Sequence, residues 1–226
     1  MVAFYVPIGL SVVTPPSITY LGVATSTATT GTTFTFSGVS FGPARGDRTI
    51  IIGAGVRDTN ISSLTIGGLT GQIASGSKIT NPSPNSFCSA IYAAQPTGTS
   101  GNIVMTVPNS INMPSIEVYA VYGLLSTISV DGSSATRQVN TTSASVNVSV
   151  NGIVVAYGMQ DNIGTTPTFS YSGVTKDDQT RYSNNFGYVT SGSRGPALTA
   201  ITPLSVSVTT SQTGSFSTYL SLASYR

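Results

Sequence analysis

The stretch Val146-Asn147-Val148-Ser149-Val150-Asn151-Gly152-Ile153-Val154-Val155-Ala156-Tyr157 decides the fold class of this chain. Asn-Gly is the preferred pair for a two-residue type I′ turn, because both central residues need a positive φ. Such a turn pairs the three valines before it with Ile153, Val155 and Tyr157, all on one face of a sheet. Register, turn and pattern agree, so the stretch predicts a β-hairpin.

The same strand chemistry recurs along the chain. β-Branched and aromatic residues form short runs, separated by turn residues about every 8 to 12 positions. A second hairpin is predicted at Gly67-Gly68, with Ile66 paired to Leu69. Good helix formers are scarce, with one Glu and two Lys in the chain. The sequence therefore predicts an all-β fold, a two-sheet antiparallel β-sandwich, with further strands near residues 33–36, 49–52, 102–107 and 116–122.

The domain organisation follows from length and proline placement. Pro7, Pro15 and Pro16 interrupt residues 1–25, and proline cannot donate to a sheet ladder, so this part is predicted to be an extended arm or an edge strand. Residues 26–226 are predicted to form the sandwich domain. The 226 residues also suffice for two small sandwiches of about 100 residues each, split near residue 130, which is the alternative.

Two faint internal echoes bear on that choice. The run that begins at Ile50 (IIIGAGVRDTNI) resembles the run that begins at Ile153 (IVVAYGMQDNI). Residues 33–39 (TFTFSGV) resemble residues 168–174 (TFSYSGV). The order of the two elements is reversed between the halves, which argues against a simple tandem duplication and favours one sandwich.

The charge content is low and evenly spread. Charged residues make up 7% of the chain, against about 25% in ordinary soluble domains. A surface of Ser, Thr, Asn and Gly suits a protein packed against neighbours. The nine basic residues form no cluster, which excludes nucleic acid as the expected partner. No run reaches the ~18 to 20 apolar residues of a membrane-spanning helix, and we expect no membrane insertion.

Catalytic groups are nearly missing from the composition. The chain has no histidine and one cysteine, which removes the usual general base and zinc sites of Cys and His. Glu117 is expected to be exposed or paired with an arginine on its strand. Asp177-Asp178 is read as a solvated turn in preference to a calcium site. We expect no enzyme activity, no catalytic residue, no metal and no cofactor.

Two local motifs favour structural interpretations. Cys88 lies in an apolar run, where a buried free thiol is the ordinary outcome, and a chain without disulfides can fold in a reducing cytoplasm. Arg45-Gly46-Asp47 matches the tripeptide that integrins recognise. Because it joins two predicted strands, with Pro43 and Gly46 suited to a turn, the sequence favours a structural loop.

The candidate contact residues lie in a loop and in the arm. The loop combines Tyr, Ser, Asn and Gly with an arginine, a composition typical of adaptable binding surfaces. It is predicted to hold a neighbouring subunit or to stack on a sugar, and the alternative is a strand pair whose aromatic rings join the core. The candidate residues are Phe4 and Tyr5 in the arm, and Arg181, Tyr182, Asn184, Asn185, Phe186 and Tyr188 in the loop.

Four further stretches carry a resemblance to a known class of proteins: residues 33–42 running into 48–52, residues 61–68, residues 96–101 and the C-terminal residues 219–226. They resemble small β-rich structural proteins of tailed-bacteriophage virions, of the decoration, head-fibre and tail-associated type. The resemblance implies a jelly-roll-like or immunoglobulin-like sandwich, oligomeric, made in the host cytoplasm and located in the virion. It carries no catalytic residues over.

The sequence thus leads to two functional hypotheses. The first is a non-catalytic particle protein that decorates or cements a capsid, or forms part of a tail or fibre, with other virion proteins and its own copies as partners. The second is a carbohydrate-binding module or receptor-binding adhesin for a cell-surface glycan. An exposed pair of aromatic rings between Arg181 and Tyr188 favours the second hypothesis, and burial of those rings in a subunit contact favours the first.

Overall fold

The computed structural model describes residues 14–26, 30–80, 87–111, 114–137, 140–161, 166–181, 187–212 and 217–226. Their regular structure is entirely β-strand, which confirms the all-β class. The strands are β1 (Ser17–Thr25), β2 (Gly31–Ser40), β3 (Arg48–Arg57), β4 (Ser63–Ile66), β5 (Leu69–Thr70), β6 (Gln72–Ile73), β7 (Phe87–Ala94), β8 (Ser100–Ile111), β9 (Ser115–Tyr122), β10 (Asp131–Arg137), β11 (Thr141–Val148), β12 (Ile153–Asp161), β13 (Phe169–Ser172), β14 (Thr175–Arg181), β15 (Gly187–Arg194), β16 (Ile201–Thr210) and β17 (Thr218–Tyr225).

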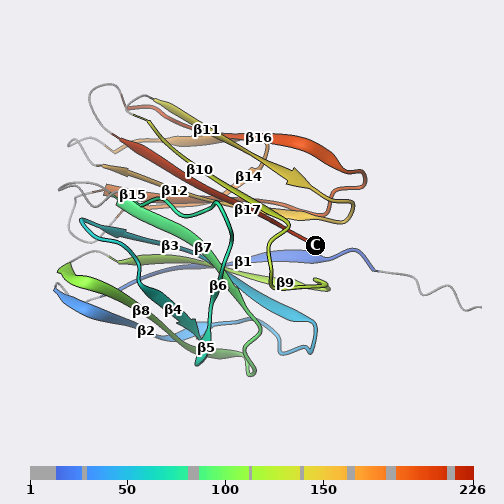
Figure 1. Cartoon of the computed structure of the whole chain (residues 1–226), viewed down its shortest axis with the longest axis horizontal. Coiled ribbons are helices and arrows are strands. Elements are labelled where there is room, and N and C mark those ends of the chain that lie inside the picture. The colour runs from blue at the N-terminus through green and yellow to red at the C-terminus, as the bar shows by residue number, and fades with distance from the viewer. Residues whose placement is uncertain are drawn as a thin grey trace, which may run out of the picture.

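These strands form four antiparallel sheets where the sequence predicted two. Sheet A has the order β1-β9-β3-β7-β6 and sheet B the order β2-β8-β4-β5. Sheet C has the order β10-β17-β12-β15-β14 and sheet D the order β11-β16-β13. Figure 1 shows them stacked as layers, with the strands of sheet B at the bottom, then sheets A and C, and sheet D at the top. The chain passes from sheet A to sheet C through residues 123–130.

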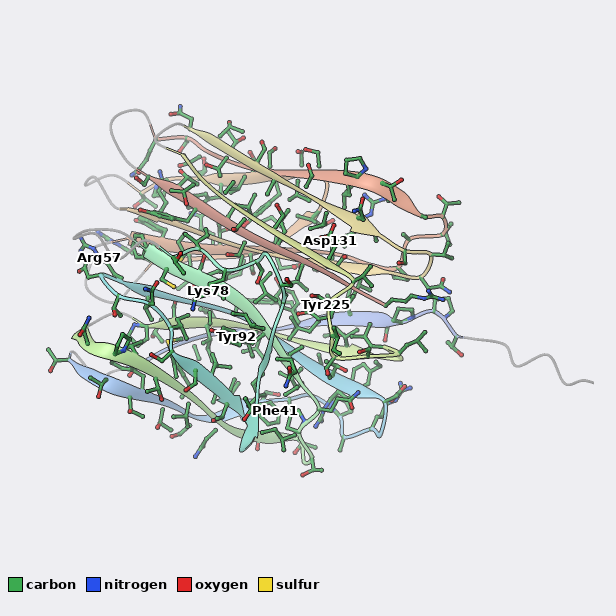
Figure 2. All side chains as sticks on the ribbon, in the orientation of Figure 1. Phe41, Arg57, Lys78, Tyr92, Asp131 and Tyr225 are labelled. Carbon is green, nitrogen blue, oxygen red and sulfur yellow. The ribbon has the colours of Figure 1, made fainter. Side chains whose placement is uncertain are left out.

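Buried side chains fill the spaces between neighbouring layers. One core cluster lies between sheets A and B, and another between sheets C and D. Two further clusters join sheet A to sheet C, and Tyr225, labelled in Figure 2, belongs to one of them. Every residue of β7, β9 and β17 is consequently buried, whereas β11, in an outer sheet, alternates between exposed and buried. The central strands of sheets A and C are thus covered on both faces, which explains the nearly continuous apolar runs in β3 and β12.

The contact between sheets A and C is closely fitted. A Cβ atom on Gly53 would lie 2.6 Å from Cδ2 of Tyr157, so the missing side chain makes room for the ring. The Tyr157 hydroxyl forms a buried hydrogen bond of 2.7 Å with Ser115 Oγ. A second buried hydrogen bond, of 2.8 Å, joins Ser89 Oγ to Ser221 Oγ. These contacts tie the two halves of the chain together across the centre of the stack.

The predicted hairpin around Asn151-Gly152 is wrong in its pairing. Asn151 has a φ of 60°, and the turn is closed by a backbone hydrogen bond from Gly152 N to Ser149 O. However, β11 pairs with β16 in sheet D, whereas β12 pairs with β15 and β17 in sheet C. The turn therefore connects two layers. Val154 and Ala156 face the core shared with sheet D, and the other face of β12 packs against sheet A.

The second predicted hairpin is confirmed. Ile66 pairs with Leu69 across Gly67 and Gly68, both of which have positive φ. Residues 17–25 of the predicted arm or edge strand form β1, which lies at the edge of sheet A beside β9. Residues 1–13 lie outside the described residues, and the division of the chain into domains stays a prediction.

The strand order of the first half recurs in the second. Sheets A and C match position by position, and β2-β8-β4 matches β11-β16-β13. β3 and β12, where the echo from Ile50 and Ile153 begins, occupy equivalent positions. Residues 33–39 lie in β2, whose equivalent is β11, so their likeness to residues 168–174 joins non-equivalent strands. The reversed order of the echoes therefore carries no weight against a tandem repeat of the fold.

Both halves also show nested pairing. β1 pairs with β9, β2 with β8, β3 with β7 and β4 with β5, as in a long hairpin wound across two sheets. In the second half β10 pairs with β17, β11 with β16 and β12 with β15. Strands distant in sequence therefore lie side by side, which brings the connections of both halves to the two ends of the stack.

Candidate functional site

One end of the stack carries most of the exposed apolar surface. β1, β3, β10 and β12 begin there, and β9 and β17 end there, as their registers show. Five of the seven large apolar side chains that are exposed among the described residues lie in the loops and strand starts at this end. We call them the end patch: Leu125, Ile128, Val130, Val150 and Leu198, with exposed fractions from 46% at Val130 to 88% at Leu198.

Backbone hydrogen bonds fix the segments that carry the end patch. Leu125 N donates to Arg226 O at 2.9 Å, and Val130 N donates to Ser224 O at 2.8 Å. The loop with Val150 is held to the loop with Leu198 because Asn151 N donates to Ala197 O at 2.8 Å. The apolar side chains of the patch are thus presented on a supported surface.

The first described residues of the chain, Thr14 to Pro16, lie at the end patch. Pro16 is buried and lines a shallow pocket of about 170 Å³ together with Leu125, Asn151 and the C-terminal Arg226. Figure 1 shows the C-terminus close to the start of β1. Thr14 and Pro15 are exposed. Residues 14–16, which follow the N-terminal segment, therefore lie beside the end patch.

The predicted contact loop is described only at its ends. Tyr188 is buried, and its ring packs against Phe169 with centroids 6.5 Å apart, so this side chain belongs to the core between sheets C and D. Arg181 is exposed, with its guanidinium 5.8 Å from the centre of the Tyr188 ring. The remaining candidates lie outside the described residues: Phe4, Tyr5, Tyr182, Asn184, Asn185 and Phe186. Their contacts stay predictions.

The Arg45-Gly46-Asp47 loop is closed on itself. Arg45 donates two hydrogen bonds to the Asp47 carboxylate, at 3.0 and 2.7 Å. Below it Arg48 is 2% exposed and donates to the carbonyl oxygens of Gly42, Pro43 and Pro96. The two charged side chains of the motif are therefore paired with each other, in agreement with a structural loop.

A buried carboxyl with two partly buried aspartates near it, the acidic cluster, lies between sheets A and C, where the sequence predicted an exposed or arginine-paired Glu117. That prediction is wrong, because Glu117 is fully buried on the face of β9 that meets sheet C. The Tyr20 hydroxyl donates a hydrogen bond of 2.5 Å to Glu117 Oε2. Burial raises the pKa of the Glu117 carboxyl to about 8, and the nearby Asp178 and Asp177 add to the rise, while the Tyr20 hydrogen bond opposes it.

The two aspartates of this cluster lie in strand β14, not in a turn. Tyr119 Oη donates to Asp177 Oδ2 at 3.0 Å, and Thr180 Oγ1 donates to Asp178 Oδ2 at 2.7 Å. Within the described ranges, no three His, Cys, Asp or Glu side chains are grouped so that they could hold a metal ion. The cluster thus joins polar groups of the two halves across the central interface.

The cysteine and the exposed apolar side chains complete the description of the site. Cys88 is a free, fully buried thiol, as predicted, and burial raises its pKa. The candidate contact residues that sequence reasoning missed are those of the end patch. Their signal was Leu124-Leu125 and Ile128 beside the alternative domain boundary near residue 130, where apolar side chains are unexpected in a connecting segment.

No described helix is long and apolar enough to cross a membrane. No protein-family model, no curated protein sequence and no solved structure matches the chain.

Proposed function

We propose that this protein is a non-catalytic structural protein of a bacteriophage particle, which decorates or cements the capsid or forms part of the tail or fibre through protein–protein contacts. The single observation that carries the proposal is the nested strand pairing of both halves. A long hairpin wound over two sheets, with eight strands in two Greek keys, is the construction of a jelly roll, a fold of viral capsid and lectin domains. The pairs β1·β9, β2·β8, β3·β7 and β4·β5 support this interpretation over an immunoglobulin-like one.

The low charge and the exposed apolar side chains of the surface support a role in assembly. Charged residues make up 7% of the chain, so little like-charge repulsion opposes close packing of copies. The end patch exposes Leu125, Ile128 and Leu198 by 70% or more, and grouped apolar side chains of this kind mark contact surfaces. Location in the virion, contacts with other virion proteins and formation of a homo-oligomer are parts of the same proposal.

The particle fraction of the source culture tests this function. Particles purified on a density gradient are digested and analysed by quantitative mass spectrometry. We expect peptides of this chain to follow the major capsid protein through the gradient at a constant ratio. Peptides confined to the soluble fraction would contradict the proposal.

The alternative is a glycan-binding module, because lectin domains share the jelly-roll construction. The described part of the loop from Arg181 to Tyr188 does not favour it, since Tyr188 is buried in the core. A glycan array probed with the labelled protein separates the two functions. Saturable binding to one glycan class by a protein missing from the particles would favour the alternative.

A further inference from the structure

We propose that the end patch binds the N-terminal segment, residues 1–13, of a second copy of this chain. The proposal rests on the proposed assembly function and names the surface and the partner through which it works. It is argued from the composition of the segment, from the place of Thr14 to Pro16 beside the patch and from the direction of β1.

The segment and the patch match in chemistry. Residues 1–13 read MVAFYVPIGLSVV, in which ten of thirteen residues are hydrophobic and none is charged. The nearest charged side chain in the sequence is Arg45. Burial of such a segment is favourable, because the free energy falls by about 25 cal/mol for each Å² of apolar surface removed from water. The end patch offers the apolar surface to receive it.

The first described residues of the chain lie within the patch. The backbone of Thr14 and Pro16 lies against Gly123, where an added Cβ would be 3.9 Å from Thr14 O and 3.5 Å from Pro16 Cα. Leu125 and Pro16 line the same shallow pocket. Each copy therefore presents a receiving surface and an apolar segment at the same end, so that two copies that meet at this end can exchange their segments reciprocally.

The direction of exit favours a second copy over the segment's own patch. β1 begins at Ser17 and runs away from this end, and Thr14 and Pro15 before it are exposed. Proline fixes φ near −65° and holds the residue before it in an extended conformation, so Pro15-Pro16 opposes an immediate reversal. Thirteen extended residues reach about 40 to 45 Å. The segment can thus cross to a neighbouring molecule.

Photo-crosslinking in the full-length protein tests the proposal. A benzoyl-phenylalanine replaces Phe4, and the same probe at Ile73 serves as the control, because Ile73 is 44% exposed in β6 and lies outside the end patch. After irradiation, a denaturing gel separates crosslinks between copies from crosslinks within one copy. Mass spectrometry then maps the attached peptide.

We expect the Phe4 probe to give a band of twice the chain mass, crosslinked to peptides with Leu125 or Leu198. The variant Leu125→Ser/Leu198→Ser is expected to weaken this band about tenfold or more, because it removes two apolar contacts that are exposed in the single copy. A crosslink to the patch at the mass of one chain would overturn the proposal in favour of the chain's own segment. Crosslinks no stronger than those at Ile73, or unaffected by the two serines, would overturn it altogether.

The crosslinking result and the density-gradient result can fail independently of each other. A chain found in particles that fails to crosslink keeps the structural role and loses this contact. A chain that crosslinks between copies and is missing from particles keeps the contact and loses the virion role.

Discussion

Tyr20 Oη donates a hydrogen bond of 2.5 Å to Oε2 of Glu117, a residue 97 positions away in the chain, in the interior between sheets A and C. Tyr20 lies on the edge strand β1 and Glu117 on its neighbour β9. Burial raises the pKa of Tyr20, with a further rise from the Glu117 charge. The contact therefore favours a protonated Tyr20 that donates to Glu117.

The first prediction concerns pH. The pKa of Glu117 is about 8 in the folded protein against 4.5 as its ordinary value, so between these values the folded state binds one more proton than the unfolded state. The free energy of unfolding must then fall as pH rises through this window, by at most about 1.4 kcal/mol per pH unit. Urea denaturation at five pH values from 5 to 9 measures the slope.

The matched variant is Glu117→Gln, which keeps an oxygen to accept from Tyr20 and cannot ionise. We expect it to lose the slope between about pH 5 and 8 and to exceed the wild type in stability at pH 9. A wild type whose stability is flat or rises over this window would contradict the buried position of the carboxyl.

The second prediction concerns the central interface. Gly53→Ala places a methyl group 2.6 Å from Cδ2 of Tyr157, which must shift and strain its hydrogen bond to Ser115. Overpacking of this kind costs about 1 to 3 kcal/mol. Gly195→Ala is the control, since nothing lies within 4 Å of the added atom. Equal midpoints of thermal unfolding for the two variants would show that sheets A and C do not pack as described.

The third prediction separates two neighbouring arginines. Arg48→Met leaves three carbonyl oxygens around a 2%-exposed side chain without their donor, and we expect a loss of about 3 kcal/mol in the free energy of unfolding. Arg45→Met breaks an exposed ion pair with Asp47, worth about 0 to 1 kcal/mol, and removes the guanidinium that lies 4.9 Å from the centre of the Tyr122 ring. Chemical denaturation of both variants gives the comparison. A larger loss for Arg45→Met would reverse the assignment.

The fourth prediction tests the strand order of sheet D. Ser207 pairs with Ser143 on one side and with Ser172 on the other. Ser143→Cys/Ser207→Cys and Ser172→Cys/Ser207→Cys are expected to form disulfides on mild oxidation. Ser143→Cys/Ser172→Cys should not, because these residues are two strands apart, about 10 Å, beyond the reach of a disulfide. The number of free thiols after oxidation shows which variants form a disulfide. A disulfide in the third variant would refute the strand order of sheet D.

The all-β class and the local turns were predictable from the sequence. The Gly67-Gly68 hairpin is confirmed because both its strands lie in one sheet, so turn chemistry sets their register. The turn at Asn151-Gly152 has the same chemistry and joins two sheets. The turn preference of Asn151-Gly152 determines that the chain bends there. The burial of β12 on both faces determines which strands β12 pairs with. The continuous run Ile153–Ala156 was the available sign of that burial.

The candidate site was less predictable. Glu117 alternates with apolar neighbours, a pattern typical of a strand with one face in water. The prediction failed because sheet C covers the face on which Glu117 lies, and the polar Glu117 itself interrupts the apolar run that would have indicated burial on both faces. The end patch is likewise assembled from separate loops, and the pairing of β9, β10 and β17 brings Leu125 and Val130 together with Val150 only in the folded chain.

The measurement that tests the central claim most directly is the mass of the full-length protein in solution by light scattering over a range of concentrations. A variant that begins at Thr14 is measured beside it, since this truncation leaves strand β1 intact. If the protein acts by assembly through its N-terminal segment, the full chain forms a defined oligomer of its 23.1 kDa unit and the truncated chain is a monomer. A full-length protein that stays a monomer at every concentration would contradict the account.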